Sequence, residues 1–271
     1  MKIALLGTCR LGSIRRHFDC TDFDEAISFV HSTKEIIQIL KYITNQIAIP
    51  DDINQFCFRR GILSRQPVFQ HERFVSQFNE ADLFVIEVCA MRKYIYEGFY
   101  MHHLAVDRRL HYHKETPKRI LENTLVQYQD RQEIEEDIAD IQSIVFPRDV
   151  LLVSHINAKI DTSASRSPYV AAAKKAKSAI SSFLSNKKND GENGRFATIG
   201  KRAELISLLR QIAQEKGIAF FDPTVVFSGY SQEQILEPEL PGLPPGHYTD
   251  FGEKIMGHLF AEEIRKICSR D

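Results

Sequence analysis

Residues 2–9, KIALLGTC, decide the fold of this chain. The run KIALL is short, continuous and apolar, which is typical of a strand buried on both faces of a parallel sheet. Gly7 ends the run and permits a tight turn. Three later apolar runs repeat the pattern, at 82–89 (DLFVIEVC), 149–154 (DVLLVS) and 218–221 (IAFF). We interpret all four runs as buried strands.

Helical patterns separate these strands, at about 33–46, 116–144 and 200–216. Strands that alternate with helices indicate a mainly parallel sheet covered on both faces, so the predicted fold class is α/β. We predict a single domain over residues 1–271. Two stretches interrupt the alternation: a charged region at 90–148, interpreted as a helical insertion, and a polar, glycine-containing stretch at 185–197, interpreted as a mobile surface loop.

Composition excludes several classes of protein. The chain has 271 residues and a formal net charge of -1, without a basic run that could follow a phosphate backbone, so we expect no nucleic-acid partner. No apolar run is long enough to span a bilayer, and the N-terminus has too few apolar residues for a signal peptide, so we predict a cytoplasmic protein. Five scattered cysteines without a CxxC pair favour reduced thiols.

Cys9 is a candidate nucleophile because loops and helix N-termini converge at the carboxyl ends of parallel strands. Gly7 allows the bend before it, and the backbone N–H groups that follow can stabilise an anion. The neighbouring Arg10 and a helix N-terminus are both expected to lower the pKa of this thiol, which favours the thiolate. The alternative is a small buried residue at a strand end, since free cysteine packs as an apolar side chain.

His247 is a candidate base near the other end of the chain. It precedes Thr249 and Asp250, either of which suits a helix N-cap, in the stretch PGHYTDFGEK. A histidine beside a helix N-terminus tends to stay neutral, as a proton acceptor must. The alternative is an ordinary histidine in a surface loop.

Other polar residues follow the remaining strands. Glu87 ends the second, His155 and Asn157 follow the third, and Asp222 follows the fourth. Glu87, His155 and Asn157 are candidates for oxyanion or substrate binding, although polar residues at strand ends also serve as hydrogen-bond partners of loops. Asp222 is a candidate for an acid that orients a histidine. Arg166, in SASRSPY, is a candidate for binding a carboxylate or phosphate, with an exposed loop arginine as the alternative.

We predict no metal site from motif spacing. Four histidines gather at His102, His103, His111 and His113, and histidine-rich tracts can bind metals. Their spacing gives no HExxH-like pair with a carboxylate base. Glycine-rich phosphate loops are missing from the sequence as well.

Taken together, Gly7-Thr8-Cys9 and the late stretch His247 to Gly252 resemble the SGNH/GDSL hydrolase superfamily, in which a nucleophile follows the first strand and a histidine opens the last helix. The resemblance implies a three-layer, flavodoxin-like parallel sheet. Cysteine replaces the usual serine, a start similar to that of GSCFA-type proteins and of capsule-polysaccharide acetyltransferases. The family's acid usually lies three residues before the histidine, where this chain has Pro244, and no Gly-x-Asn-Asp follows residues 82–89.

The resemblance implies an enzyme of acyl esters, an esterase, deacylase or O-acyltransferase acting on a carbohydrate with Cys9 and His247 as its pair. Hydrolysis requires no cofactor, whereas a polysaccharide O-acetyltransferase would take its acyl group from acetyl-coenzyme A. The N–H groups of Cys9 or Arg10, with Asn157, are expected to bind the oxyanion. Candidate acids to orient His247 are Asp222, Glu239 and Asp250, of which Asp250 also fits an ordinary carboxylate at a helix end. Without such an acid, Cys9 and His247 would work as a dyad. The alternative is a degenerate member that binds carbohydrate or protein.

Overall fold

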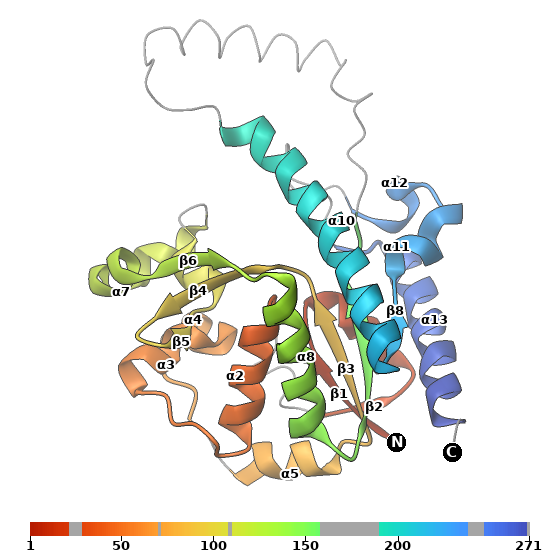
Figure 1. Cartoon of the computed structure of the whole chain (residues 1–271), viewed down its shortest axis with the longest axis horizontal. Helices are drawn as coiled ribbons and strands as arrows, with labels where there is room; N and C mark the ends of the chain where they lie inside the picture. Colours follow the sequence, from red (N-terminus) through yellow and green to blue (C-terminus); the bar gives the residue numbers. More distant parts are fainter. Residues whose placement is uncertain (22–28, 70–71, 108–109, 158–189, 238–246, 270–271) are drawn as a thin grey trace, which may run out of the picture.

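The centre of the molecule is a five-stranded sheet in which all strands run parallel, in the order β2-β1-β3-β7-β8 (Figure 1). Numbered by the sheet's own strands, this is 2-1-3-4-5, the order of flavodoxin-like folds, so the predicted fold class is confirmed. The strands are β1 (Lys2–Leu6), β2 (Asp19–Cys20), β3 (Leu83–Val88), β7 (Asp149–Ser154) and β8 (Ala219–Phe221). The computed structural model describes residues 1–21, 29–69, 72–107, 110–157, 190–237 and 247–269.

Helices cover both faces of this sheet. Alternate side chains of β1 enter two separate hydrophobic clusters, Ala4 and Leu6 on one face and Ile3 and Leu5 on the other. This alternation gives three layers, as the resemblance implied. The first face is covered by α2 (Thr33–Ile43), α5 (Glu72–Glu80), α8 (Arg131–Val145) and α10 (Asp190–Lys216), and the second by α13 (Asp250–Cys268) with the 3₁₀ helix η1 (Cys9–Arg16).

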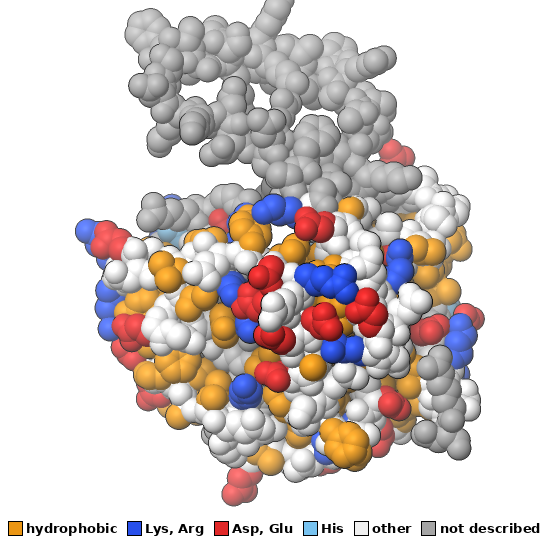
Figure 2. Space-filling view, viewed as in Figure 1, with side chains coloured by type: hydrophobic (Ala, Val, Ile, Leu, Met, Phe, Trp, Pro, Cys, Tyr) orange, Lys and Arg blue, Asp and Glu red, His pale blue; other side chains and the backbone are white. Residues whose placement is uncertain are grey.

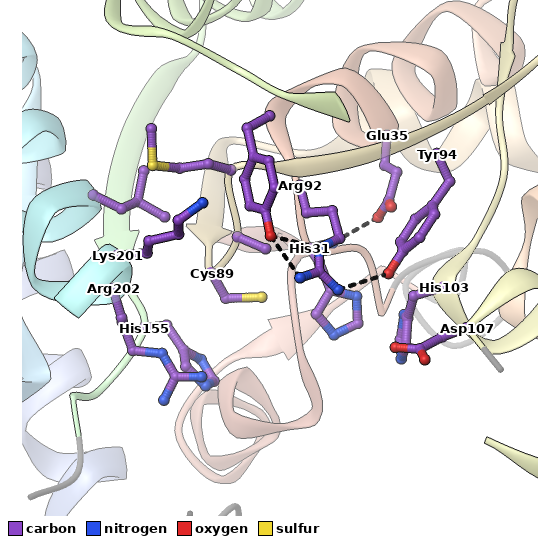
Figure 3. Close-up of a pocket in the computed structure, with 14 residues that line it drawn as sticks. His31, Glu35, Cys89, Arg92, Tyr94, His103, Asp107, His155, Lys201 and Arg202 are labelled. Atoms are coloured by element: carbon purple, nitrogen blue, oxygen red, sulfur yellow. Dashed lines mark hydrogen bonds between the residues drawn. The ribbon is translucent and has the colours of Figure 1, made fainter. Parts of the chain in front are cut away.

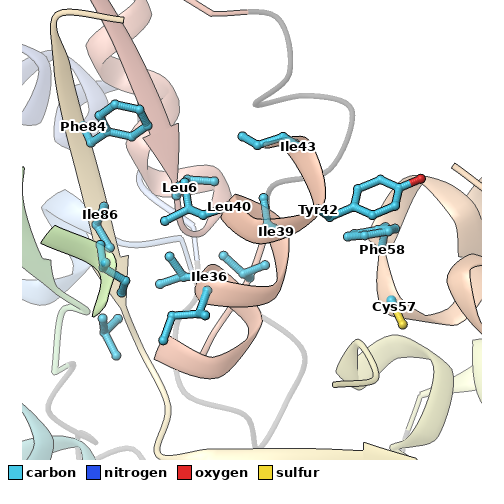
Figure 4. Packing of buried hydrophobic residues seen from close by; sticks show 14 of the residues in the cluster. Leu6, Ile36, Ile39, Leu40, Tyr42, Ile43, Cys57, Phe58, Phe84 and Ile86 are labelled. Carbon is cyan, nitrogen blue, oxygen red and sulfur yellow. The ribbon is translucent and has the colours of Figure 1, made fainter. Parts of the chain in front are cut away.

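Helix α2 shows how the sequence builds the first layer. Ser32 caps it by accepting a hydrogen bond from the Glu35 N–H (3.4 Å). Isoleucine and leucine recur at helical spacing after the cap, and Ile36 and Leu40 are fully buried against Phe84 of β3 and its neighbours (Figure 4). Burying one such side chain contributes about 1.5–3 kcal/mol, so this face fixes α2 on the sheet.

The insertion expected to be helical at 90–148 instead carries a second, antiparallel sheet in the order β5-β4-β6. Its β4–β5 hairpin turns at Glu97 and Gly98, which both have positive φ (49° and 83°). That left-handed pair matches the twist of a two-residue hairpin, a turn signal that the charge-rich composition obscured. β6 also divides the helix expected at 116–144. The elements are β4 (Arg92–Tyr96), β5 (Phe99–Tyr100), α7 (Lys118–Asn123), β6 (Leu125–Tyr128) and α8.

The loop expected at 185–197 is helical from Asp190 onward, while residues 185–189 lie outside the described part of the chain. Leu209 and Ile212 of α10 are fully buried, so the later part of this helix packs against the sheet. The remaining elements are α3 (Asp51–Cys57), α4 (Arg59–Ser64), α6 (His103–Val106), η2 (His111–Glu115), α11 (Pro223–Val226), η4 (Phe227–Gly229) and α12 (Gln232–Ile235).

Acidic and basic side chains are interspersed over the face where α8 and α10 lie (Figure 2). Among them, Arg131 pairs with Glu215 (3.0 Å) and Lys216 with Glu135 (3.6 Å), which joins the two helices. Exposed pairs of this kind contribute little stability, about 0–1 kcal/mol each. Among the described residues, no helix has both the length and the apolar character that crossing a membrane requires.

Candidate active site

The fold brings the two ends of the chain together at Cys9 and His247. Cys9 is the first residue of η1, directly after β1, and His247 lies just before α13. Both are exposed, and the Cys9 Sγ lies 3.4 Å from the His247 Nδ1. That distance allows a thiol to hydrogen-bond to an imidazole nitrogen. The geometry expected of a nucleophile and its base is therefore present.

Backbone contacts hold His247 in place. Its carbonyl accepts a hydrogen bond from the Glu237 N–H (2.9 Å), and Tyr248 forms an antiparallel bridge with Leu236. Gly252, in the first turn of α13, packs so closely that a Cβ there would lie 2.3 Å from the Ile235 carbonyl oxygen. The glycine of the late motif thus permits the contact that seats the histidine.

The pKa of the Cys9 thiol differs from the sequence-based expectation. We predicted that Arg10 and the helix N-terminus would lower its pKa. Although Cys9 is accessible to solvent, desolvation by the surrounding protein raises the pKa of its thiol, and the lowering effect of Arg10 does not compensate. The Glu87 carboxylate adds to this rise in pKa. The resting pair is therefore a neutral thiol beside an imidazole, and not a stored thiolate.

Beneath Cys9 lies a buried network centred on Glu87. One carboxylate oxygen, Oε2, accepts hydrogen bonds from the Thr8 N–H (2.8 Å) and the Thr8 hydroxyl (2.5 Å). The other, Oε1, lies 2.6 Å from the His155 Nδ1. Gly7 makes room for this carboxylate, since a Cβ on it would lie 2.5 Å from the Glu87 Cβ. Glu87 therefore fixes the backbone that presents Cys9.

Arg10 also belongs to this network. Its guanidinium hydrogen-bonds to the His155 ring and lies 5.8 Å from the centre of the Tyr248 ring. Arg10 is buried, and so are its two partners. The residue thus links the loop of Cys9 to the residue that follows His247.

The protonation states of the network follow from its hydrogen bonds. Burial opposes charge on Glu87, but His155, Arg10 and Thr8 outweigh it and lower the pKa of Glu87 to about 2. Desolvation and the nearby Arg10 lower the pKa of His155 to about 3. A neutral His155 that donates from Nδ1 to Glu87 keeps its Nε2 lone pair for Arg10, which satisfies all three groups.

The two candidate acids that the structure describes, Asp222 and Asp250, lie in different surroundings. Asp222 caps α11: its Oδ1 accepts hydrogen bonds from the Thr224 N–H (2.9 Å) and the Ser154 hydroxyl (3.2 Å), and its Oδ2 pairs with Arg210. Asp250 is exposed in the first turn of α13.

Asn157 and Arg166 complete the predicted set. The Asn157 N–H donates to the Thr224 hydroxyl (2.9 Å), and its buried Oδ1 has no hydrogen-bond partner within the described residues. Arg166, like Glu239, lies outside the residues that the structure describes.

On its far side, the network borders a cavity of about 300 Å³ (Figure 3). Sequence reasoning missed most of its lining, because the residues come from α2, β4, α6 and α10, which only the fold brings together. Burial lowers the pKa of His31, which lines the cavity, well below the ordinary histidine value. It does the same to the pKa of the buried His102. The cavity is lined by His31, Glu35, Cys89, Ala90, Met91, Arg92, Tyr94, His103, Asp107, Tyr128, His155, Lys201, Arg202 and Leu205.

Comparisons with known proteins give a family model and a curated relative that this chain is similar to. Residues 1–120 match the family model described as the TviD N-terminal domain. The chain is also 23% identical over 300 residues to the Vi polysaccharide biosynthesis protein TviD of Salmonella typhi, across 95% of this chain and 31% of that protein. The chain thus spans about a third of the length of this curated relative. The resemblance to proteins of polysaccharide biosynthesis is confirmed.

Solved structures with a similar arrangement include two esterases. The native aryl esterase of M. smegmatis superposes with a TM-score of 0.41 at 11% identity, covering 98% of each chain. Est24, a carbohydrate acetylesterase from Sinorhizobium meliloti, gives a TM-score of 0.42 at 10% identity, covering 98% of this chain and 99% of that one.

Proposed function

We propose that this protein is an enzyme of carbohydrate acyl esters in which Cys9 is the nucleophile and His247 the general base. The observation that carries the proposal is the 3.4 Å contact between the Cys9 Sγ and the His247 Nδ1. The two residues come from opposite ends of the sequence and meet at an exposed position at the carboxyl edge of a parallel sheet, where ligands bind in such folds. The similarity to a polysaccharide biosynthesis protein supports a saccharide as the substrate.

The raised pKa of Cys9 determines how the first step proceeds. His247 removes the thiol proton as the sulfur attacks the acyl carbonyl carbon, so the thiolate forms during the reaction. The tetrahedral intermediate collapses with cleavage of the bond to the leaving oxygen or sulfur. The His247 imidazolium returns the proton to that leaving group, and the acyl group remains on Cys9 as a thioester.

The second half of the reaction transfers the acyl group. His247 takes a proton from the acceptor hydroxyl, the acceptor oxygen attacks the thioester, and the Cys9 thiolate leaves and regains the proton. Water as acceptor gives hydrolysis, and a sugar hydroxyl gives an O-acylated saccharide.

Backbone N–H groups at the start of η1 supply the oxyanion site. The Thr8 N–H is already bonded to Glu87, and the Arg10 N–H makes only a long contact to the Thr8 hydroxyl (3.4 Å). The Cys9 N–H lies in the first turn, where helical N–H groups lack an intrahelical acceptor. We assign the oxyanion to the N–H groups of Cys9 and Arg10, with the Asn157 side chain as a further candidate.

Of the predicted carboxylates, Asp222 and Asp250 lie within the described residues, and the partners that each already has support a choice between them. The two oxygens of Asp222 already bind Ser154, Thr224 and Arg210. Asp250 lies in the same segment as His247, three residues on, and is exposed. We assign the orienting role to Asp250, and Asp250→Asn is expected to lower kcat more than it raises KM.

Acetyl-coenzyme A is the acyl donor that suits the biosynthetic similarity, and we place the reaction in the cytoplasm, where this donor is made. The test incubates the chain with acetyl-coenzyme A and an oligosaccharide, and measures free coenzyme A together with acetate and acetylated sugar. Transfer predicts acetylated sugar in amounts that match free coenzyme A. Acetate alone identifies a hydrolase. A second assay supplies acetylated sugars as the acyl donor. If neither donor gives any product, the proposal is contradicted, and a carbohydrate-binding protein is the alternative.

Cysteine variants connect any activity to the proposed site. Cys9→Ala is expected to abolish turnover, whereas Cys268→Ala removes another exposed cysteine and should leave it unchanged. Equal activity in the two variants would place the chemistry elsewhere.

A further inference from the structure

Three histidines meet at the wall of the cavity behind the Glu87 network. His31 precedes α2, and His102 and His103 begin α6. One ring nitrogen of each lies within 4.8 Å of the others. We propose that His31, His102 and His103 bind a divalent transition metal of the zinc class. This site is separate from Cys9 and His247 and goes beyond the proposed acyl transfer.

His31 is held rigidly by its backbone. Its N–H donates to the Glu35 carboxylate (2.7 Å), and its carbonyl accepts hydrogen bonds from the N–H groups of Cys89 (3.0 Å) and Ala90 (2.9 Å). One atom of its side chain lacks a partner: the buried Nδ1 has no hydrogen-bond partner among the described residues. A buried polar atom left unsatisfied costs about 1–3 kcal/mol, so this nitrogen requires a ligand that the chain itself does not supply.

The two histidines of α6 are fixed against α2 as a unit. The Gln38 side chain of α2 both donates to the Tyr100 carbonyl (2.9 Å) and accepts from the Tyr100 N–H (2.8 Å). The His102 N–H, two residues on, donates to the Phe56 carbonyl (2.9 Å). These bonds set the distance between His31 and the α6 pair before any metal arrives.

The ring of His102 has the arrangement of a metal ligand with an outer-shell partner. Its Nε2 lies 2.9 Å from the Phe29 carbonyl oxygen, so Nε2 carries the proton. Its Nδ1 therefore has the lone pair, which accepts a long hydrogen bond from the Leu104 N–H (3.2 Å). Metal-binding histidines usually donate their second N–H to a carbonyl or carboxylate, as His102 does here. A metal on Nδ1 replaces only the weaker contact.

Three imidazoles favour zinc, copper, nickel or iron over calcium or magnesium, which prefer oxygen. The rings of His31 and His103 lie 4.0 Å apart between centroids, and those of His102 and His103 lie 4.4 Å apart. His31 and His103 also line the cavity (Figure 3), so a fourth coordination position faces that space. Three protein ligands and one open position are the pattern of zinc sites that bind water or substrate.

The first test titrates the metal-stripped chain with Zn²⁺ by calorimetry. We expect one ion per chain. His31→Ala should weaken Zn²⁺ binding more than about 100-fold. A loss of that size exceeds the effect of removing a residue that only hydrogen-bonds to a metal ligand. The matched control is His113→Ala, a partly buried histidine whose Nδ1 contacts the Leu110 carbonyl outside the cluster. Wild-type affinity in His31→Ala, or loss in His247→Ala instead, overturns the assignment.

A second test needs no variant that could misfold. Co²⁺ bound to the wild-type chain should show a visible spectrum of nitrogen ligation, without the charge-transfer absorption that a thiolate ligand produces. Thiolate absorption would place the ion on a cysteine such as Cys9 and contradict the three-histidine site. Absence of any bound Co²⁺ or Zn²⁺ also contradicts it.

Discussion

The Cys9–His247 pair and the network around Glu87 lie side by side but differ in nearly every physical respect. The pair is exposed, its thiol carries a raised pKa, and its partners come from the two ends of the chain. The network is buried, its carboxylate carries a lowered pKa, and it is closed by hydrogen bonds on both oxygens. The residues proposed for the chemistry thus lie at the surface, and a closed network of hydrogen bonds lies beneath them.

This contrast predicts that substitutions in the pair change the rate and substitutions in the network change the stability. Cys9→Ala should lower acyl transfer by at least about 10⁴-fold, because it removes the attacking atom. His247→Ala should cost about 10²–10⁴-fold, the contribution of a general base. Unfolding in denaturant should change by no more than about 0.5 kcal/mol in either variant, because both residues are exposed. A large loss of stability in Cys9→Ala would show that the exposed pair also stabilises the fold, which contradicts this prediction.

Glu87→Gln tests the network. Removing one partner of a buried charged pair costs about 3–5 kcal/mol, and we expect a loss of that order in the free energy of unfolding at pH 7. Because the pKa of Glu87 in the folded protein, about 2, is below its ordinary value of 4.5, ionised Glu87 stabilises the fold above pH 4.5. That contribution is lost as the pH falls toward 2.

Denaturant unfolding of both proteins at several pH values checks this sign. The gap between wild type and Glu87→Gln should shrink as the pH is lowered through this window. As a control, Glu80→Gln removes an exposed carboxylate that pairs with Lys2 and should have little effect at any pH. A gap that widens toward low pH would mean that Glu87 is protonated in the native state.

Gly252→Ala tests the close contact between α12 and the first turn of α13, the helix that follows His247. A Cβ at this position meets the Ile235 carbonyl oxygen at 2.3 Å, so the backbone has to move. We expect a loss of about 1–3 kcal/mol in unfolding free energy, together with reduced kcat, because His247 lies in the displaced segment. Gly12→Ala is the matched control, since a Cβ there meets nothing within 4 Å. Equal effects in the two variants would show that the close approach at Gly252 does not matter.

Arg16→Ala should have the smallest effect. Arg16 of η1 pairs with Glu253 of α13 at 2.5 Å, but both side chains are more than 40% exposed. Water screens such a pair, so the expected loss of stability is below about 1 kcal/mol, and it should diminish further in high salt. A loss as large as that of Glu87→Gln would mean that the surface contacts of η1 hold the site as firmly as its buried ones.

The sequence predicted the parts of the molecule that depend on local pattern. The buried strand at 2–6, the strands at 149–154 and 82–89, and the α/β class followed from continuous apolar runs, and the structure confirms them. Cys9 and His247 followed from short motifs at the two chain ends, and the structure places them in contact. Their chemical role stays a prediction.

The rest depends on tertiary contacts that no local pattern contains. The pKa of Cys9 rises because desolvation exceeds the effect of Arg10, and desolvation is set by neighbours distant in sequence. Glu87 was a plausible substrate ligand as a strand-end residue, yet its oxygens bind Thr8 and His155. The hairpin at Glu97 and Gly98 could have been found from its turn residues, whereas the approach of His31 to the α6 histidines could not.

Trapping the acyl group on Cys9 decides whether this residue is the nucleophile. The chain is mixed with a reactive acetyl ester, quenched at early times and digested, and the acetylated peptide is identified by mass spectrometry. We expect a transient thioester on Cys9, formed at least about 100-fold more slowly in His247→Ala. Acetylation elsewhere, or acetylation of Cys9 at the same rate without His247, would contradict the nucleophile and base that the structure brings together.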